Sequence, residues 1–141
     1  MQRVSNKLKE AIKIKQSHLC LGIDPPEDCS EEQILAIVEE VKDYCVAYKI
    51  NLAHFISRFS TEDLEEFIET IKIDDPNSIV ILDGKFGDIA STNEYYVKLR
   101  KRIDVDSLTL NPYCGLENLQ PFLNDEDSLN FLLTRMSQPS S

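Results

Sequence analysis

The stretch Ser78-Ile-Val-Ile-Leu-Asp-Gly-Lys-Phe-Gly-Asp-Ile-Ala-Ser-Thr92 indicates how this chain folds. It begins with four consecutive apolar residues, which is typical of a parallel strand covered on both faces. Charged residues follow at once, and then residues 89–102, whose apolar positions recur at helical spacing. The order is therefore buried strand, polar loop and helix, which is the repeating unit of α/β proteins.

The same unit recurs on both sides of this stretch. With 78–83, the predicted strands are 18–23, 46–51, 107–111 and 128–134. With 89–102, the predicted helices are 31–44, 61–73 and 116–123, and an additional N-terminal helix spans 4–15. Ser30-Glu-Glu-Gln33 is typical of a capping box at a helix start, and Asp74-Asp-Pro-Asn77 is expected to close a helix.

Five strands and four intervening helices fit two α/β folds. One is a doubly wound five-stranded domain, and the other is the first part of a (βα)8 barrel, which takes about 250 residues. The 141 residues contain no low-complexity segment or interdomain linker, so we expect a single domain over 1–141.

Composition narrows the function classes. Twenty-five acidic and fifteen basic residues give a net charge of -10, which disfavours nucleic acid and anionic membranes as partners. No apolar run approaches the roughly 18 residues of a membrane span, and residues 1–16 do not resemble a signal peptide, so we expect a cytoplasmic protein. The four cysteines form no CxxC pair, and reduced cysteines with packing roles are expected, with a disulfide or zinc site as the alternative.

Polar side chains lie at the C-terminal ends of four predicted strands, where α/β proteins bind ligands. These residues are Asp24, Lys49, Asn51, Asp83, Lys85 and Asn111. Because side chains alternate along a strand, Asp83 and Lys85 should point to the same side.

Two interpretations of Asp83 and Lys85 remain open on these residues alone. They can form a plain salt bridge at a barrel rim, with Asp88 capping the helix that follows. Lys49 favours a functional interpretation, because a second lysine at the end of an apolar strand is costly to place without acidic partners. Lysines and carboxylates in alternation would give the preorganised electrostatics that carbanion chemistry requires.

Residues 83–92 resemble the D-x-K-x-x-D signature of the orotidine 5'-phosphate decarboxylase family. Leu21-Gly-Ile-Asp24-Pro is similar to the first-strand motif of that family, and Tyr48-Lys49-Ile-Asn51 to its second-strand lysine motif. Asn111-Pro-Tyr-Cys-Gly115 resembles the fourth βα unit of one branch, and residues 134–139 resemble the loop after strand five. The resemblance covers essentially the whole chain, in order.

The resemblance implies decarboxylation of orotidine 5'-monophosphate to UMP, in de novo pyrimidine biosynthesis, without a metal or organic cofactor. It implies a network of Lys49, Asp83, Lys85 and Asp88 in which Lys85 protonates the carbanion at C6 of the pyrimidine. Related sugar-phosphate decarboxylases and aldolase-type synthases also carry D-x-K-x-x-D, but they depend on magnesium and typically have an acidic residue in place of Lys49.

The resemblance also assigns binding residues and a partner. Asp24 and Lys49 would contact the ribose hydroxyls, and Ser137 would hydrogen-bond the pyrimidine. Asp88 and Thr92 would reach into the site of a neighbouring subunit, which implies a homodimer with shared sites.

The chain departs from the family in its length. Members are clearly longer, with three further βα units whose late loops grip the substrate phosphate. The expected fold is therefore a partial TIM (βα)8 barrel of about (βα)4 plus a fifth strand, with an extra N-terminal helix. A catalytically incomplete half-barrel or a protein-interaction module is the alternative function.

Overall fold

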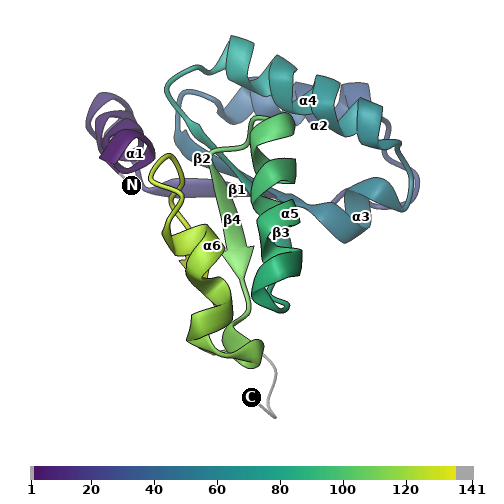
Figure 1. Ribbon diagram of the computed structural model, residues 1–141. Helices are drawn as coiled ribbons and strands as arrows, with labels where there is room; N and C mark the ends of the chain where they lie inside the picture. The colour runs from purple at the N-terminus through teal and green to yellow at the C-terminus, as the bar shows by residue number, and fades with distance from the viewer. Residues whose placement is uncertain (1, 136–141) are drawn as a thin grey trace.

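The computed structural model describes residues 2–135, in which strands and helices alternate along the chain (Figure 1). The strands are β1 (Leu19–Ile23), β2 (Cys45–Asn51), β3 (Ile79–Phe86), β4 (Ser107–Leu110) and β5 (Phe131–Leu132). The helices are α1 (Gln2–Lys15), α2 (Glu31–Val41), α3 (Leu52–Ile56), α4 (Thr61–Asp74), α5 (Ala90–Arg102) and α6 (Gln120–Leu123). Two 3-10 helices, η1 (Pro112–Cys114) and η2 (Leu116–Leu119), follow β4.

The order of the strands decides between the two folds expected from the sequence. All four neighbouring pairs are parallel, and the order in space is β1-β2-β3-β4-β5, the same as along the chain. A doubly wound sheet reverses its strand order at a switch point, whereas a (βα)8 barrel keeps it sequential. The partial barrel is therefore confirmed, and within the described residues its sheet is open at β1 and β5.

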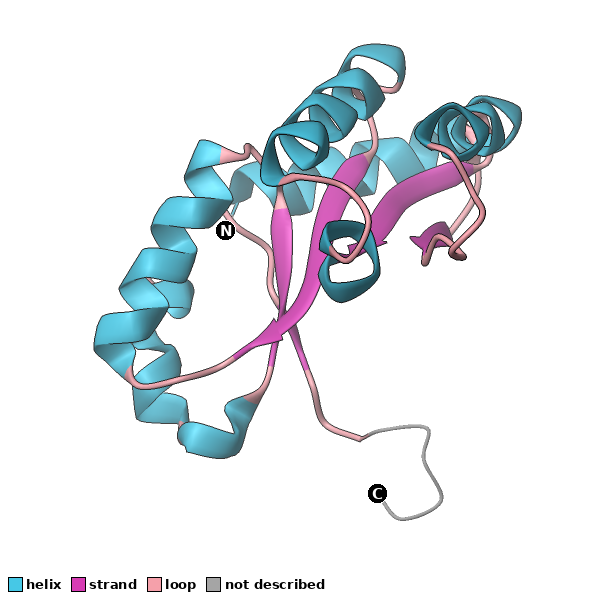
Figure 2. Ribbon diagram, turned by 90° about the vertical axis from the view of Figure 1, so that its right-hand side faces the viewer, coloured by secondary structure: helices cyan, strands magenta, loops and turns pink. Residues whose placement is uncertain are grey.

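The sheet separates two sets of apolar side chains. On the outer face, strand residues such as Tyr48, Leu82 and Leu108 pack against helices that include Val38 of α2 and Phe67 of α4. Figure 2 shows the strands as one twisted sheet with helices packed around it. On the inner face the cluster is small and is covered by α1. It consists of Val4, Ala47, Ile79 and Ile81, with Leu8 and Leu129 beside it.

Local signals account for the helix starts. The predicted capping box at Ser30 is confirmed, because its hydroxyl accepts from the backbone N–H of Gln33, whose side chain accepts from that of Ser30. A second capping box, formed by Ser60 and Asp63, starts α4. Helix α4 ends at Asp74, one residue beyond the predicted 61–73. None of the described helices is long and apolar enough to cross a membrane.

Several predicted boundaries are wrong. The helix expected over 31–44 ends at Val41, and that over 116–123 is a 3-10 turn followed by the single turn α6, with Pro121 inside it. The strand expected over 128–134 shrinks to Phe131–Leu132, because β5 pairs only with β4. Strand β3 runs beyond Asp83 to Phe86, and α3 was not predicted.

The cysteines are free, as expected, but their packing roles differ. Cys45 is buried and Cys29 is half-buried, whereas Cys20 and Cys114 are exposed. The expected reduced state is therefore confirmed, and burial supports a packing role for Cys45 and Cys29 only.

Candidate active site

Lys49, Asp83 and Lys85 meet at the C-terminal ends of β2 and β3. The Lys49 ammonium donates to Asp83 Oδ2 at 2.8 Å, and the Lys85 ammonium donates to Asp83 Oδ1 at 2.9 Å. The Asp83 side chain is 7% exposed, whereas those of Lys49 and Lys85 are 33% and 41% exposed. A buried carboxylate thus holds two ammonium groups that still reach solvent.

Strand β3 bulges where it carries this pair. Leu82 pairs with Leu108 and Phe86 pairs with Leu110, so the three residues 83–85 of β3 face the single residue Thr109 of β4. Lys85 has φ of 48°, a left-handed conformation that costs a non-glycine residue free energy.

Thr109 connects the two residues of the bulge. Its hydroxyl donates to Asp83 Oδ1 at 2.7 Å and accepts from the backbone N–H of Lys85 at 3.0 Å. We did not predict Thr109 as a site residue. The available signal was a hydroxyl residue two positions before Asn111 and therefore on the same side of the strand as it.

The surroundings of Asp83 keep it ionised. Burial alone would raise the pKa of the Asp83 carboxyl, but hydrogen bonds from Lys49, Thr109 and Lys85 outweigh it and lower the pKa to about 2. At neutral pH one carboxylate therefore stands between two ammonium groups, a net charge of +1 on a chain of net charge -10. This local excess of positive charge suits an anionic ligand.

Asp24 lies at the same end of the sheet, on the far side of β2. Its Oδ1 accepts from Asn51 Nδ2 at 2.6 Å. The other end of the Asn51 amide caps α3, because Asn51 Oδ1 accepts from the backbone N–H of His54. Asn51 thereby fixes Asp24 near the strand end, a role that the sequence did not indicate.

Asp88 stands outside the network formed by Lys49, Asp83 and Lys85. Within residues 2–135 no ion pair joins Asp88 to a lysine, and its Oδ1 accepts from the backbone N–H of Ile89 at 2.7 Å. The N-cap of α5 is Ile89, so the interpretation of Asp88 as the helix cap is wrong. Buried Asn93 holds this loop by accepting from Asp88 N and donating to Asp88 O.

The remaining predicted binding residues are Thr92 and Ser137. Thr92 lies in the first turn of α5 and is half-buried. Ser137 lies outside the described residues.

The family assignment rests on comparison with known proteins. The model of the Orotidine 5'-phosphate decarboxylase / HUMPS family matches residues 17–141. The chain belongs to this family. Curated orotidine 5'-phosphate decarboxylases from Parabacteroides distasonis and Azoarcus sp. are 37% and 35% identical to it, over 95% and 94% of the chain. The chain spans about half of these relatives, 53% of each.

Solved structures agree with the family assignment. Leishmania donovani UMP synthase superposes with a TM-score of 0.84 at 30% identity, covering 96% of this chain and 31% of that one. Leishmania donovani OMP decarboxylase superposes with a TM-score of 0.75 at 31% identity, covering 97% and 55%. The chain therefore corresponds to about half of the Leishmania donovani OMP decarboxylase, which agrees with a partial barrel.

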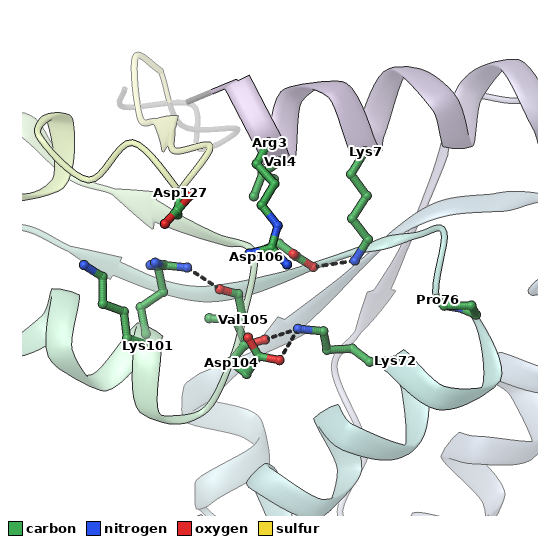
Figure 3. Close-up of a pocket in the computed structure, with 11 residues that line it drawn as sticks. Arg3, Val4, Lys7, Lys72, Pro76, Lys101, Asp104, Val105, Asp106 and Asp127 are labelled. Atoms are coloured by element: carbon green, nitrogen blue, oxygen red, sulfur yellow. Dashed lines mark hydrogen bonds and ion pairs between the residues drawn. The ribbon is translucent and has the colours of Figure 1, made fainter.

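A cavity of about 670 Å³ lies at the opposite end of the sheet, among the segments that lead into β3, β4 and β5 (Figure 3). Four of its charged side chains form two ion pairs, Lys7 with Asp106 at 3.2 Å and Lys72 with Asp104 at 2.5 Å. Barrel enzymes place their chemistry at the C-terminal ends of the strands, so we do not assign this cavity to the active site.

A second hollow of about 340 Å³ does adjoin the charged residues. It runs along the inner face between α1 and the sheet, past Cys20, Ala47 and Ile79, and reaches Lys49 and Thr109.

Proposed function

We propose that this chain carries the charge-stabilising half of an orotidine 5'-phosphate decarboxylase site, which converts orotidine 5'-monophosphate to UMP without a cofactor. The observation that carries the proposal is the buried Asp83 carboxylate held between Lys49 and Lys85 at the ends of two barrel strands. Family membership supports the same substrate and reaction class.

The proposed reaction balances without an oxidant or reductant. The bond between C6 of the pyrimidine and its carboxyl carbon breaks, its electron pair stays on C6, and carbon dioxide leaves. The Lys85 ammonium stabilises this carbanion and gives it a proton, which leaves a neutral amine that takes a proton back from solvent. Asp83 would lie beside the departing carboxylate and hold Lys85 in place.

The substrate contacts follow from the family resemblance. Asp24 and Lys49 would bind the ribose hydroxyls, and their approach to the same strand ends supports this role. Ser137 would bind the pyrimidine. The phosphate grip belongs to later units of the family's barrel, so residues 1–141 would supply little of the remote binding energy that organises the chemistry.

The proposed partner is a second copy of the chain, with Asp88 and Thr92 contributed to the neighbouring site. Supporting this, Asp88 lies outside its own chain's network and is exposed. Large apolar side chains are also exposed on the adjoining loops, namely Ile89 (56%), Tyr113 (92%) and Leu116 (58%). Exposed apolar side chains beside a site are typical of an interface. A cytoplasmic location remains a prediction.

The decisive experiment is the ultraviolet absorbance change of orotidine 5'-monophosphate incubated with the chain. Lys85→Ala is the test variant, and Lys9→Ala, an exposed lysine on α1, is its matched control. We expect turnover that is lost in Lys85→Ala and kept in Lys9→Ala. Turnover that survives Lys85→Ala would refute the role of Lys85, and absence of turnover in the unsubstituted chain would withdraw the enzymatic function from it.

An interaction module is the second candidate function, favoured by the open edges of the sheet at β1 and β5 within the described residues. Apolar side chains at both sheet edges are exposed, with Leu19 at 60%, Phe131 at 42% and Leu132 at 44%. Unpaired strand edges pair readily with another chain. Sedimentation velocity tests this function: a compact monomer removes its basis, and a dimer that Leu19→Lys dissociates supports pairing through these edges.

A further inference from the structure

The bulge in β3 interrupts the regular pairing of the candidate site with β4. Residues 83–85 face one residue of β4, so the backbone N–H of Lys85 has no ladder position opposite it. Lys85 also adopts a left-handed conformation, at φ of 48°. Such a conformation persists only where the surroundings fix it. A specific partner must therefore hold Lys85 in place.

Thr109 is that partner, and its hydroxyl both donates and accepts a hydrogen bond. A threonine hydroxyl has one proton to donate and can accept as well. The proton goes to Asp83 Oδ1 at 2.7 Å, and the oxygen accepts from Lys85 N at 3.0 Å. The residue is 8% exposed, so water has little access to replace either bond.

We propose that Thr109 is the positioning residue of the site. By hydrogen-bonding both the Asp83 carboxylate and the backbone N–H of Lys85, it fixes the position from which the Lys85 ammonium reaches the substrate. The proposal rests on the proposed function, because aiming matters only if Lys85 delivers a proton. Thr109 touches no reacting atom and acts through its two partners.

Residue 109 must both donate a hydrogen bond to Asp83 and accept one from the backbone N–H of Lys85, which requires a hydroxyl. A valine would fill the same volume but would leave Lys85 N and one lone pair of Asp83 without a partner. A serine keeps the hydroxyl and loses only a methyl group. Serine should therefore restore what valine removes, which a role in packing alone would not predict.

The test is the titration of Asp83, followed by carboxyl carbon chemical shifts in the full chain and its variants. In Thr109→Val the pKa of Asp83 should rise by about one unit, because a hydrogen bond to a charged group is lost. Thr109→Ser should restore the original value. Ser107→Ala is the matched control, since the Ser107 hydroxyl, two residues earlier on β4, is buried without a hydrogen-bond partner in the described residues.

The outcomes separate this proposal from the proposed function. Unchanged titration of Asp83 in Thr109→Val, or failure of serine to restore it, would overturn the positioning role whether or not the chain is active. If Thr109→Val does not fold, Thr109→Ala removes the same hydroxyl and gives the same measurement.

If the chain turns over orotidine 5'-monophosphate, kcat should fall about tenfold in Thr109→Val with little change in KM. A chain without turnover refutes the proposed function and leaves the titration to decide the link between Thr109 and Asp83.

Discussion

Replacing Lys15 by methionine should destabilise the fold strongly, although Lys15 lies far from the candidate site in sequence and ends α1. Its ammonium lies within hydrogen-bond distance of four oxygens: Asp75 Oδ2 at 2.5 Å, Ser78 Oγ at 2.8 Å, and the backbone oxygens of Lys42 and Cys45 at 2.6 and 2.7 Å. The side chain is 8% exposed and that of Asp75 is 6% exposed. One buried cation thus ties α1 to the segments leading into β2 and β3.

The magnitude follows from what the substitution leaves behind. Removing one member of a buried ion pair costs about 3–5 kcal/mol, because the other charge stays buried. In Lys15→Met, Asp75 keeps two neutral donors, the hydroxyls of Tyr48 at 2.8 Å and Ser78 at 2.6 Å. We therefore expect a loss near the lower limit, about 3 kcal/mol in the free energy of unfolding. For a chain of this length that corresponds to a fall in Tm of roughly 10 °C.

Urea unfolding at pH 7, followed by circular dichroism, measures this loss. Lys13→Met is the matched control, because Lys13 is an exposed lysine of the same helix and its replacement should change the free energy by less than about 0.5 kcal/mol. A loss below about 1 kcal/mol in Lys15→Met, or one equal to that of Lys13→Met, would show that the buried network does not hold α1 in place.

Three further predictions concern charge and close packing. The pKa of Asp83 is about 2 in the folded chain against an ordinary 3.8, so ionised Asp83 contributes about 1–2 kcal/mol to the free energy of unfolding. This contribution is complete above pH 3.8 and is lost as the pH falls through 2. In urea unfolding between pH 2 and 7, Asp83→Asn should therefore reduce the loss of stability at acid pH. Arg100→Met should cost about 3 kcal/mol in the same assay at pH 7, since Arg100 is 8% exposed within a buried ion pair, whereas Lys101→Met, 56% exposed, should stay within about 0.5 kcal/mol. Gly87→Ala should cost about 1–3 kcal/mol in thermal unfolding, because its Cβ would lie 2.0 Å from a backbone oxygen after β4, whereas Gly22→Ala would meet only a side-chain oxygen at 3.3 Å and should be milder.

Continuous apolar runs predicted β2, β3 and β4 well, because these three strands are buried along most of their length. Strand β1 was also predicted, although only Ile23 of its five residues is buried. Ile79–Leu82 is fully apolar because both of its faces are covered, the outer face by the later helices and the inner face by α1. The prediction of a strand over 128–134 was wrong in length. Strand β5 lies at an edge of the sheet and Phe131 and Leu132 are exposed, so its apolar side chains do not indicate how far it pairs. The 3-10 turns after β4 also escaped prediction, because their spacing resembles that of an α-helix.

Lys49, Asp83 and Lys85 were predictable because parallel strands bring their C-terminal ends to one edge. The bulge was not, since a gain of two residues in β3 depends on its partner strand. The importance of Thr109 follows from that bulge and therefore escaped as well. The backbone at Asp88 is held by Asn93, whose Nδ2 donates to Asp88 O and to the backbone oxygen of Asn118, a residue far away in the sequence that meets Asn93 only in the folded chain.

The contacts of Lys49, Asp83 and Lys85 explain why a partial barrel can hold these three residues together. Asp83 is held by Lys49 of β2 and by Thr109 of β4, so three adjacent strands contain the whole arrangement. No contact of Asp83 within the described residues depends on β1 or β5. Supplying the later barrel units should therefore strengthen substrate binding while leaving the pKa of Asp83 close to 2. A marked change in the titration of Asp83 on completing the barrel would mean that the closed fold, and not the local strand contacts, sets the charge of the site.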